Sequence, residues 1–225
     1  MKKISREADR RDSFPPFLQT SSYDRFKRAF DVSFSVVFLV SVMSWLTPLV
    51  ALAILLDSPG PVFFVQRRVG KNGKLFPCLK FRTMILNDVA NELQASNDDR
   101  RITFVGRLLR RTNIDEFPQF FNVLIGDMSV VGPRPHMPSD YTRFSFVIPS
   151  YHLRTVVQPG ITGLAQVKSL QGPALNHEAI YMRYHWDAEY IRHAAFALDL
   201  KITVITMLRG LANLVFAAGA LVTGR

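Results

Sequence analysis

Residues 32–56 read VSFSVVFLVSVMSWLTPLVALAILL and contain no charged side chain. As an α-helix this stretch is roughly 37 Å long, enough to cross the hydrocarbon core of a bilayer. Basic residues flank it on both sides, among them Arg25 and Arg28 before it and Arg67 and Arg68 after it. Such flanks are normally kept in the cytoplasm. A straight crossing would export one of them, whereas a helix that enters, bends and returns would keep both.

Thr47-Pro48 is the expected position of such a bend, because proline lacks an N–H group and clashes with the preceding turn. The hydroxyl groups of Ser41, Ser44 and Thr47 are expected to satisfy the carbonyl groups that a bend releases. The alternative is an ordinary single span with a mild proline kink. Hydropathy alone does not separate the two.

The composition points to one domain with a membrane element. The chain has 225 residues and a net charge of +10, which favours an anionic partner: nucleic acid, acidic lipid or a phosphorylated substrate. Beside a membrane segment, anionic headgroups account for much of that charge. The lone cysteine, Cys78, excludes an internal disulfide framework and suits the cytoplasm.

Hydrophobic periodicity and turn residues predict a series of short elements. Gly70-Lys71-Asn72-Gly73 is typical of a hairpin turn. The apolar tail 196–222 is interrupted by Arg209, which favours a helix in the membrane interface over a crossing. The expected strands are Val62–Val65, Leu75–Phe81 and Leu164–Val167, and the expected helices are Asn87–Gln94, Ile102–Leu109, Thr112–Ile125 (ended at Gly126), Ser139–Phe146 and Asn176–His193.

The run RRTNIDEFPQ at residues 110–119 is the densest candidate for chemistry. Two adjacent carboxylates, Asp115 and Glu116, follow Arg110 and Arg111, and a carboxylate in a cationic environment can act as a covalent nucleophile toward phosphorus. The alternative is helix capping, because Thr112-x-x-Asp115 and Asn113-x-x-Glu116 both resemble capping boxes. Spacing alone favours capping.

Two further motifs present cations. In Gly132-Pro133-Arg134-Pro135, two prolines hold one arginine, which would present its guanidinium to a phosphate at low entropic cost. In Lys80-Phe81-Arg82-Thr83, alternation puts two cations on one face of a strand. Each motif alone is more typical of a solvated surface. The sequence lacks both glycine-rich nucleotide-loop signatures, and its histidines lack zinc-site spacing.

Taken together and in this order, KFRTM (80–84), RRTNIDEFPQ (110–119), MSVVGPRP (128–135) and QPGITGLAQV (158–167) resemble the bacterial sugar transferase family, the monotopic polyprenyl-phosphate phosphoglycosyl transferases. The resemblance covers roughly residues 26–206. It implies an α+β, mostly helical fold, in which a re-entrant membrane helix precedes a compact cytosolic domain with short strands and interfacial amphipathic helices. We therefore expect a basic, mobile tail at 1–22, the re-entrant helix at 23–57, the catalytic domain at 58–200 and an apolar, membrane-associated helix at 201–225.

The activity that the resemblance implies has two steps. Asp115 attacks the β-phosphorus of a UDP-sugar and expels UMP, and a polyprenyl phosphate (undecaprenyl phosphate) then takes the sugar phosphate from the enzyme. Glu116 assists as acid/base or positioning group, and Mg²⁺ bridges the substrate phosphates and Asp115. The residues expected to bind phosphate or nucleotide are Arg134, Lys80, Arg82, Arg110, Arg111, Gln119 and Pro133.

The resemblance also implies a place and partners. The enzyme is expected on the cytoplasmic face of the bacterial inner membrane, in contact with anionic lipids and not with nucleic acid, in the first membrane step of exopolysaccharide, capsule, O-antigen or glycoconjugate synthesis. A homodimer is left open, and so is the sugar, with glucose and galactose the leading candidates. Phe117 stands where the family usually has leucine, and Lys168 to Gly172 lack the Arg-Gly of many glucose and galactose enzymes. The alternative is an inactive scaffold or an acidic-lipid-binding protein.

Overall fold

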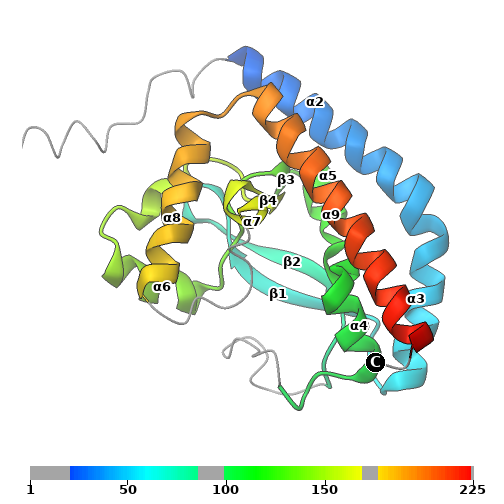
Figure 1. Cartoon of the computed structure of the whole chain (residues 1–225). Coiled ribbons are helices and arrows are strands. Elements are labelled where there is room, and N and C mark those ends of the chain that lie inside the picture. Colours follow the sequence, from blue (N-terminus) through cyan, green and yellow to red (C-terminus); the bar gives the residue numbers. More distant parts are fainter. Residues whose placement is uncertain (1–20, 86–98, 169–176, 224–225) are drawn as a thin grey trace, which may run out of the picture.

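The computed structural model describes residues 21–85, 99–168 and 177–223. Within these ranges the chain is mostly helical with two small sheets, which confirms the α+β prediction (Figure 1). The expected helix Asn87–Gln94 and most of the expected tail 1–22 lie outside the described residues. The helices are α2 (Ser21–Phe38), α3 (Ser44–Asp57), α4 (Phe104–Thr112), α5 (Gln119–Ile125), α6 (Pro138–Val147), α7 (Leu164–Val167), α8 (His177–Arg192) and α9 (Phe196–Thr223), and the strands are β1 (Phe63–Val69), β2 (Leu75–Phe81), β3 (Ser129–Val131) and β4 (Gly160–Thr162).

The long N-terminal helix changes direction between α2 and α3 (Figure 1). A π-helical turn, Leu39–Met43, joins them, while Pro48 lies inside the regular helix α3. The irregular turn therefore precedes Thr47-Pro48 rather than coinciding with it, because a proline removes the hydrogen bond to the residue four positions earlier and disturbs the turn before it. Ser41 and Ser44 donate to the carbonyl oxygens of Val37 and Val40, as expected, whereas the Thr47 hydroxyl contacts the sulfur of Met43.

Among the residues that the structure describes, two helices are long and apolar enough to cross a membrane, Ser22–Asp57 and Phe196–Ala217. Both present large apolar side chains to the surface, such as Leu52 and Leu56 on α3 and Leu208 and Phe216 on α9. Helix α9 begins at Phe196, so the expected boundary at residue 201 lies inside it. The re-entrant path and the division into segments stay predictions.

The antiparallel hairpin β1–β2 forms as predicted, with β1 extended to Val69. Its turn uses left-handed backbone at Asn72 (φ 55°) and Gly73 (φ 75°), which asparagine and glycine adopt at low cost. The other sheet is a parallel pair, β3 and β4. The predicted strand Leu164–Val167 is wrong: β4 occupies Gly160–Thr162, and Leu164–Val167 forms the short helix α7, since a four-residue apolar run does not distinguish the two.

The main core lies between the β1–β2 hairpin, α5, β3, α8 and α9, with Val123, Val131 and Ile191 fully buried. Aromatic side chains of α2 pack against this core, and Phe38 stacks on Phe120 with 4.2 Å between ring centroids. Beneath them, a buried polar network ties α2 to the domain. Asp31 accepts hydrogen bonds from Ser129 and Val130 at the start of β3, and Lys27 donates to Asp199 and to the Val131 carbonyl oxygen.

Candidate active site

The two adjacent carboxylates lie in a break between two helices. The predicted helix Thr112–Ile125 is wrong: α4 ends at Thr112, and the backbone of the next residue, Asn113, is left-handed (φ 58°). Ile114–Glu116 then forms a 3₁₀ turn, and Pro118 precedes α5. Asparagine tolerates the left-handed region that ends a helix. No side chain caps α5, and the Thr112 hydroxyl donates back into α4, so the capping interpretation is also wrong. The turn faces the β1–β2 hairpin.

Glu116 is held by two cations from different motifs. Lys80 on β2 donates to Oε1 at 2.6 Å, and Arg134 makes a bidentate pair, Nη1 to Oε2 at 2.8 Å and Nη2 to Oε1. Burial by itself would raise the pKa of Glu116, but Arg134 and Lys80 outweigh it and hold that pKa well below its usual range. Glu116 in turn raises the pKa of the Arg134 guanidinium. The pair is permanently charged near neutral pH.

Asp115 has the opposite character. Its side chain is 8% exposed, and burial, opposed by Lys80 and reinforced by the Glu116 charge, raises the pKa of its carboxyl to about 6. Within the described part of the chain its carboxylate makes no hydrogen bond and no ion pair, although Arg110 and Arg134 also attract it. Two neighbouring carboxylates are thus driven apart in pKa, which is typical of sites where acids have separate tasks.

Arg110 reaches the same turn from α4. Its Nε donates to the Thr83 hydroxyl at 2.8 Å, and among the charges that act on it the Asp115 carboxylate is the strongest. The structure therefore brings four of the predicted site residues around the Asp115 carboxylate, which makes no hydrogen bond: Glu116, Lys80, Arg110 and Arg134.

Arg82 lies elsewhere, and the prediction that it binds phosphate is corrected. All its guanidinium N–H groups donate hydrogen bonds to the loop after α3. Nε donates to the Pro61 carbonyl oxygen at 2.6 Å, and the terminal nitrogens donate to Ser58, Pro59 and Gly60. Arg82 is only 3% exposed. A guanidinium has five N–H donors, so none remains for a ligand. Arg82 anchors the loop after α3 to the end of the hairpin.

Three other predicted residues lie at the edge of the site or away from it. Arg111 is exposed and stacks over the Phe216 ring of α9 at 4.9 Å, so the structure does not bring it to Asp115. Gln119 is buried at the start of α5. The Pro133 carbonyl oxygen accepts from the Gly160 backbone N–H at 3.0 Å, which fixes the loop that carries Arg134.

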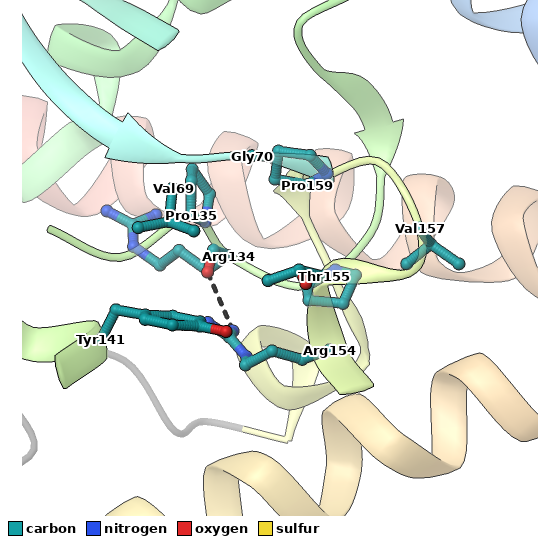
Figure 2. Close-up of a pocket in the computed structure, with 10 residues that line it drawn as sticks. Val69, Gly70, Arg134, Pro135, Tyr141, Arg154, Thr155, Val157 and Pro159 are labelled. Atoms are coloured by element: carbon teal, nitrogen blue, oxygen red, sulfur yellow. Dashed lines mark hydrogen bonds between the residues drawn. The ribbon is translucent and has the colours of Figure 1, made fainter. Parts of the chain in front are cut away.

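Sequence reasoning missed several charged residues around that loop. Arg68 of β1 donates to the Pro135 carbonyl oxygen. The signal was present, because strand alternation places Arg68 on the same face of the hairpin as Lys80. Arg154 and Asp187 form a buried ion pair at 2.6 Å beneath the loop. No local sequence pattern predicts that these two residues pair. A small pocket beside Arg134 is lined by Pro133, Pro159, Val157 and the Tyr141 ring among others (Figure 2).

The residues fit Mg²⁺ only together with a substrate. No group of three or more metal-ligating side chains occurs in the part of the chain described here. Glu116 is already neutralised, which leaves Asp115 as the available carboxylate, among cations that oppose a bare dication. Mg²⁺ is commonly held by one or two carboxylates plus substrate phosphates, so Asp115 with a diphosphate would suffice.

Comparison with known proteins places this constellation in a family. The sequence model described as "Bacterial sugar transferase" matches residues 22–213. The chain belongs to the bacterial sugar transferase family. The match confirms the resemblance drawn from the four motifs and covers every residue of the site.

Named relatives of this chain include an undecaprenyl-phosphate glucose phosphotransferase of Komagataeibacter xylinus, 45% identical over 81% of the chain and 35% of the relative. Another is the exopolysaccharide production protein PSS of Rhizobium leguminosarum bv. phaseoli, 44% identical over 78% of the chain and 90% of the relative. A third is an undecaprenyl-phosphate galactose phosphotransferase of Salmonella typhimurium, 37% identical over 78% of the chain and 38% of the relative. The chain thus spans less than half of the length of two of these three relatives.

Proposed function

We propose that this protein transfers a hexose 1-phosphate from a UDP-sugar to undecaprenyl phosphate through a covalent phosphosugar on Asp115. The observation that carries the proposal is the Asp115 carboxylate itself: buried, without a hydrogen bond, beside Lys80, Arg110 and Arg134, and next to a carboxylate that is already paired. The relatives named for undecaprenyl-phosphate glucose and galactose phosphotransfer support the acceptor and a hexose as the sugar.

Each of the two steps forms one P–O bond and breaks another, and neither step takes up or releases a proton. A carboxylate oxygen of Asp115 attacks the β-phosphorus of the UDP-sugar, the bond from that phosphorus to the bridging oxygen breaks, and UMP leaves. An oxygen of undecaprenyl phosphate then attacks the same phosphorus, the bond to Asp115 breaks, and the carboxylate is restored as the polyprenyl-diphosphate-sugar departs. Phosphoryl transfer of this kind depends on positioning and charge neutralisation, which Lys80, Arg110 and Arg134 supply.

Glu116 fits a positioning role better than proton transfer. Its low pKa and its pairs with Lys80 and Arg134 keep it ionised across the working pH range, so it has no proton to give. By pairing with Lys80 and Arg134, Glu116 holds both cations close to Asp115. When bound, Mg²⁺ would neutralise diphosphate oxygens beside Asp115.

The membrane arrangement belongs to the same proposal. The exposed apolar side chains of α3 and α9 favour contact with lipid, and the basic flanks favour a re-entrant α2–α3 helix with anionic headgroups beside it on the cytoplasmic side of the inner membrane. Cysteine probes at residues 5 and 90 should then both react only from the cytoplasm. A periplasmic label at residue 5 would indicate an ordinary span.

The direct test is release of UMP from UDP-glucose and UDP-galactose by the purified, detergent-solubilised protein. The wild type is expected to release UMP, and Asp115→Asn is expected to release none. Mass spectrometry of material trapped without acceptor should find the phosphosugar on residue 115. Release by Asp115→Asn, or an adduct elsewhere, would defeat the nucleophile assignment. No release with any UDP-sugar would favour an inactive scaffold or a lipid-binding protein.

A further inference from the structure

The loop that carries Arg134 has an unusually complete set of main-chain contacts. Four consecutive carbonyl oxygens, those of residues 133–136, each accept a hydrogen bond from a different donor group. In order, the donors are the Gly160 backbone N–H at 3.0 Å, Arg154 Nη2 at 2.9 Å, Arg68 Nη1 at 3.1 Å and the Val69 backbone N–H at 2.9 Å. Two of these four donors are side chains, from β1 and from the 3₁₀ turn Tyr151–Thr155.

Arg154 is buried, and its guanidinium makes hydrogen bonds to several groups. It is 5% exposed, and its guanidinium reaches Asp187 Oδ2 through Nε and Nη2 at 3.2 and 2.6 Å. Nη1 lies 3.1 Å from His136 Nδ1, and because a guanidinium has no acceptor, that ring nitrogen accepts. Figure 2 shows Arg154 below the loop, joined to the main-chain oxygen of Arg134. One planar group therefore touches α8 and both ends of the segment 134–136.

Arg68 binds the next residue of the same segment, Pro135. Its Nη2 donates to Gln66 Oε1 on its own strand, and its Nη1 donates to the Pro135 carbonyl oxygen. Neither Arg68 nor Arg154 makes a hydrogen bond to Glu116, whose partners are Lys80 and Arg134. Both therefore donate hydrogen bonds to the loop and not to Glu116.

We propose that Arg154 and Arg68 are positioning residues that clamp the main chain at Arg134 and Pro135, so that the Arg134 guanidinium stays on Glu116 and beside Asp115. A guanidinium that must meet two carboxylate oxygens at once tolerates little displacement, and a 1 Å misplacement costs on the order of a hundredfold in rate. The catalytic part of this inference rests on the proposed function. The clamp itself does not.

Arg154→Lys is the first test. Lysine keeps the charge that Asp187 needs, but its single nitrogen cannot reach Asp187, the Arg134 carbonyl oxygen and His136 together. We expect kcat/KM for UMP release from UDP-glucose to fall roughly ten- to a hundredfold. The control is Arg192→Lys on α8, an exposed i, i+3 partner of Glu189, which should change it less than about twofold.

A double-mutant cycle separates positioning from general damage. In an Arg134→Lys background the added Arg154→Lys change should cost less than about threefold, because the group that it positions is already altered. An equal loss in both backgrounds would overturn the proposal. If Arg154→Lys does not fold, the same double-mutant cycle can be measured with Arg68→Lys, because the Arg68 side chain is only half-buried.

Hydrogen exchange of residues 132–137 tests the clamp without catalysis. Arg154→Lys and Arg68→Lys should speed exchange there and not in α5, whereas Arg192→Lys should leave it unchanged. Unchanged exchange in both clamp variants would overturn the clamp. A wild type that releases no UMP would defeat the proposed function and leave this measurement valid.

Discussion

Replacing Asp115 with asparagine is expected to stabilise the protein while abolishing its activity. The carboxyl is buried, and its pKa is raised from an ordinary value of 3.8 to about 6, so the folded state disfavours the ionised form. A change of that size corresponds to about 3 kcal/mol. Asparagine has nearly the same shape and no charge, so the variant avoids this cost. In a chain of this length the gain corresponds to a melting temperature higher by roughly 5–10 °C at pH 8.

The pH dependence makes the prediction specific. Because the folded state binds this proton more tightly than the unfolded chain, the cost is fully present above pH 6 and disappears as the pH falls from 6 to 3.8. The stability advantage of Asp115→Asn should therefore shrink to about half at pH 5. Asp24→Asn, at an exposed position of α2, is the matched control.

Thermal unfolding in detergent, followed at pH 8 and pH 5 alongside UMP release, measures both effects. A lower melting temperature for Asp115→Asn at pH 8 would refute the reasoning, since it would mean that the surrounding cations stabilise this carboxylate more than burial penalises it. A gain that does not change with pH would show that the ionised form is not its source.

Three further outcomes follow from the same contacts. For the wild type, kcat/KM for UMP release should fall about tenfold per pH unit below pH 6, as Asp115 takes up its proton. Glu116→Gln should lose activity and about 2–3 kcal/mol of stability, because two cations lose their partner but keep some contact with water. Gly106→Ala should cost about 3 kcal/mol, because a Cβ there would lie 2.0 Å from the Thr83 carbonyl oxygen and would push α4 off the hairpin.

Each has a result that contradicts it. A rate that is flat down to pH 5 would mean that Asp115 is ionised there, and a Glu116→Gln variant as stable as the wild type would mean that the ion pairs contribute nothing. A Gly106→Ala protein with an unchanged melting temperature would show that α4 can shift without cost. Arg192→Lys serves as the common control for expression and unfolding, because Arg192 pairs with Glu189 of the same helix, where both side chains are partly exposed.

The hairpin was predictable because its information is local. Apolar alternation and the Asn72-Gly73 turn determine β1 and β2 within twenty residues. The same holds for the apolar helices, whose length and composition appear directly in the sequence. The predicted helix Thr112–Ile125 failed for a local reason of another kind: Asn113 adopts a left-handed conformation that apolar periodicity does not report.

By itself, the sequence determined the long apolar helices, the hairpin, the presence of an acidic pair among cations and the family. Only the tertiary structure decided which cation meets which carboxylate. Lys80 and Arg134, 54 residues apart in the chain, both pair with Glu116. Arg82, two residues from Lys80, instead donates its hydrogen bonds to the loop after α3. The physical reason is that ion pairing depends on distances across the fold, and a side chain's charge is the same in the sequence whether it faces a substrate or a backbone carbonyl group.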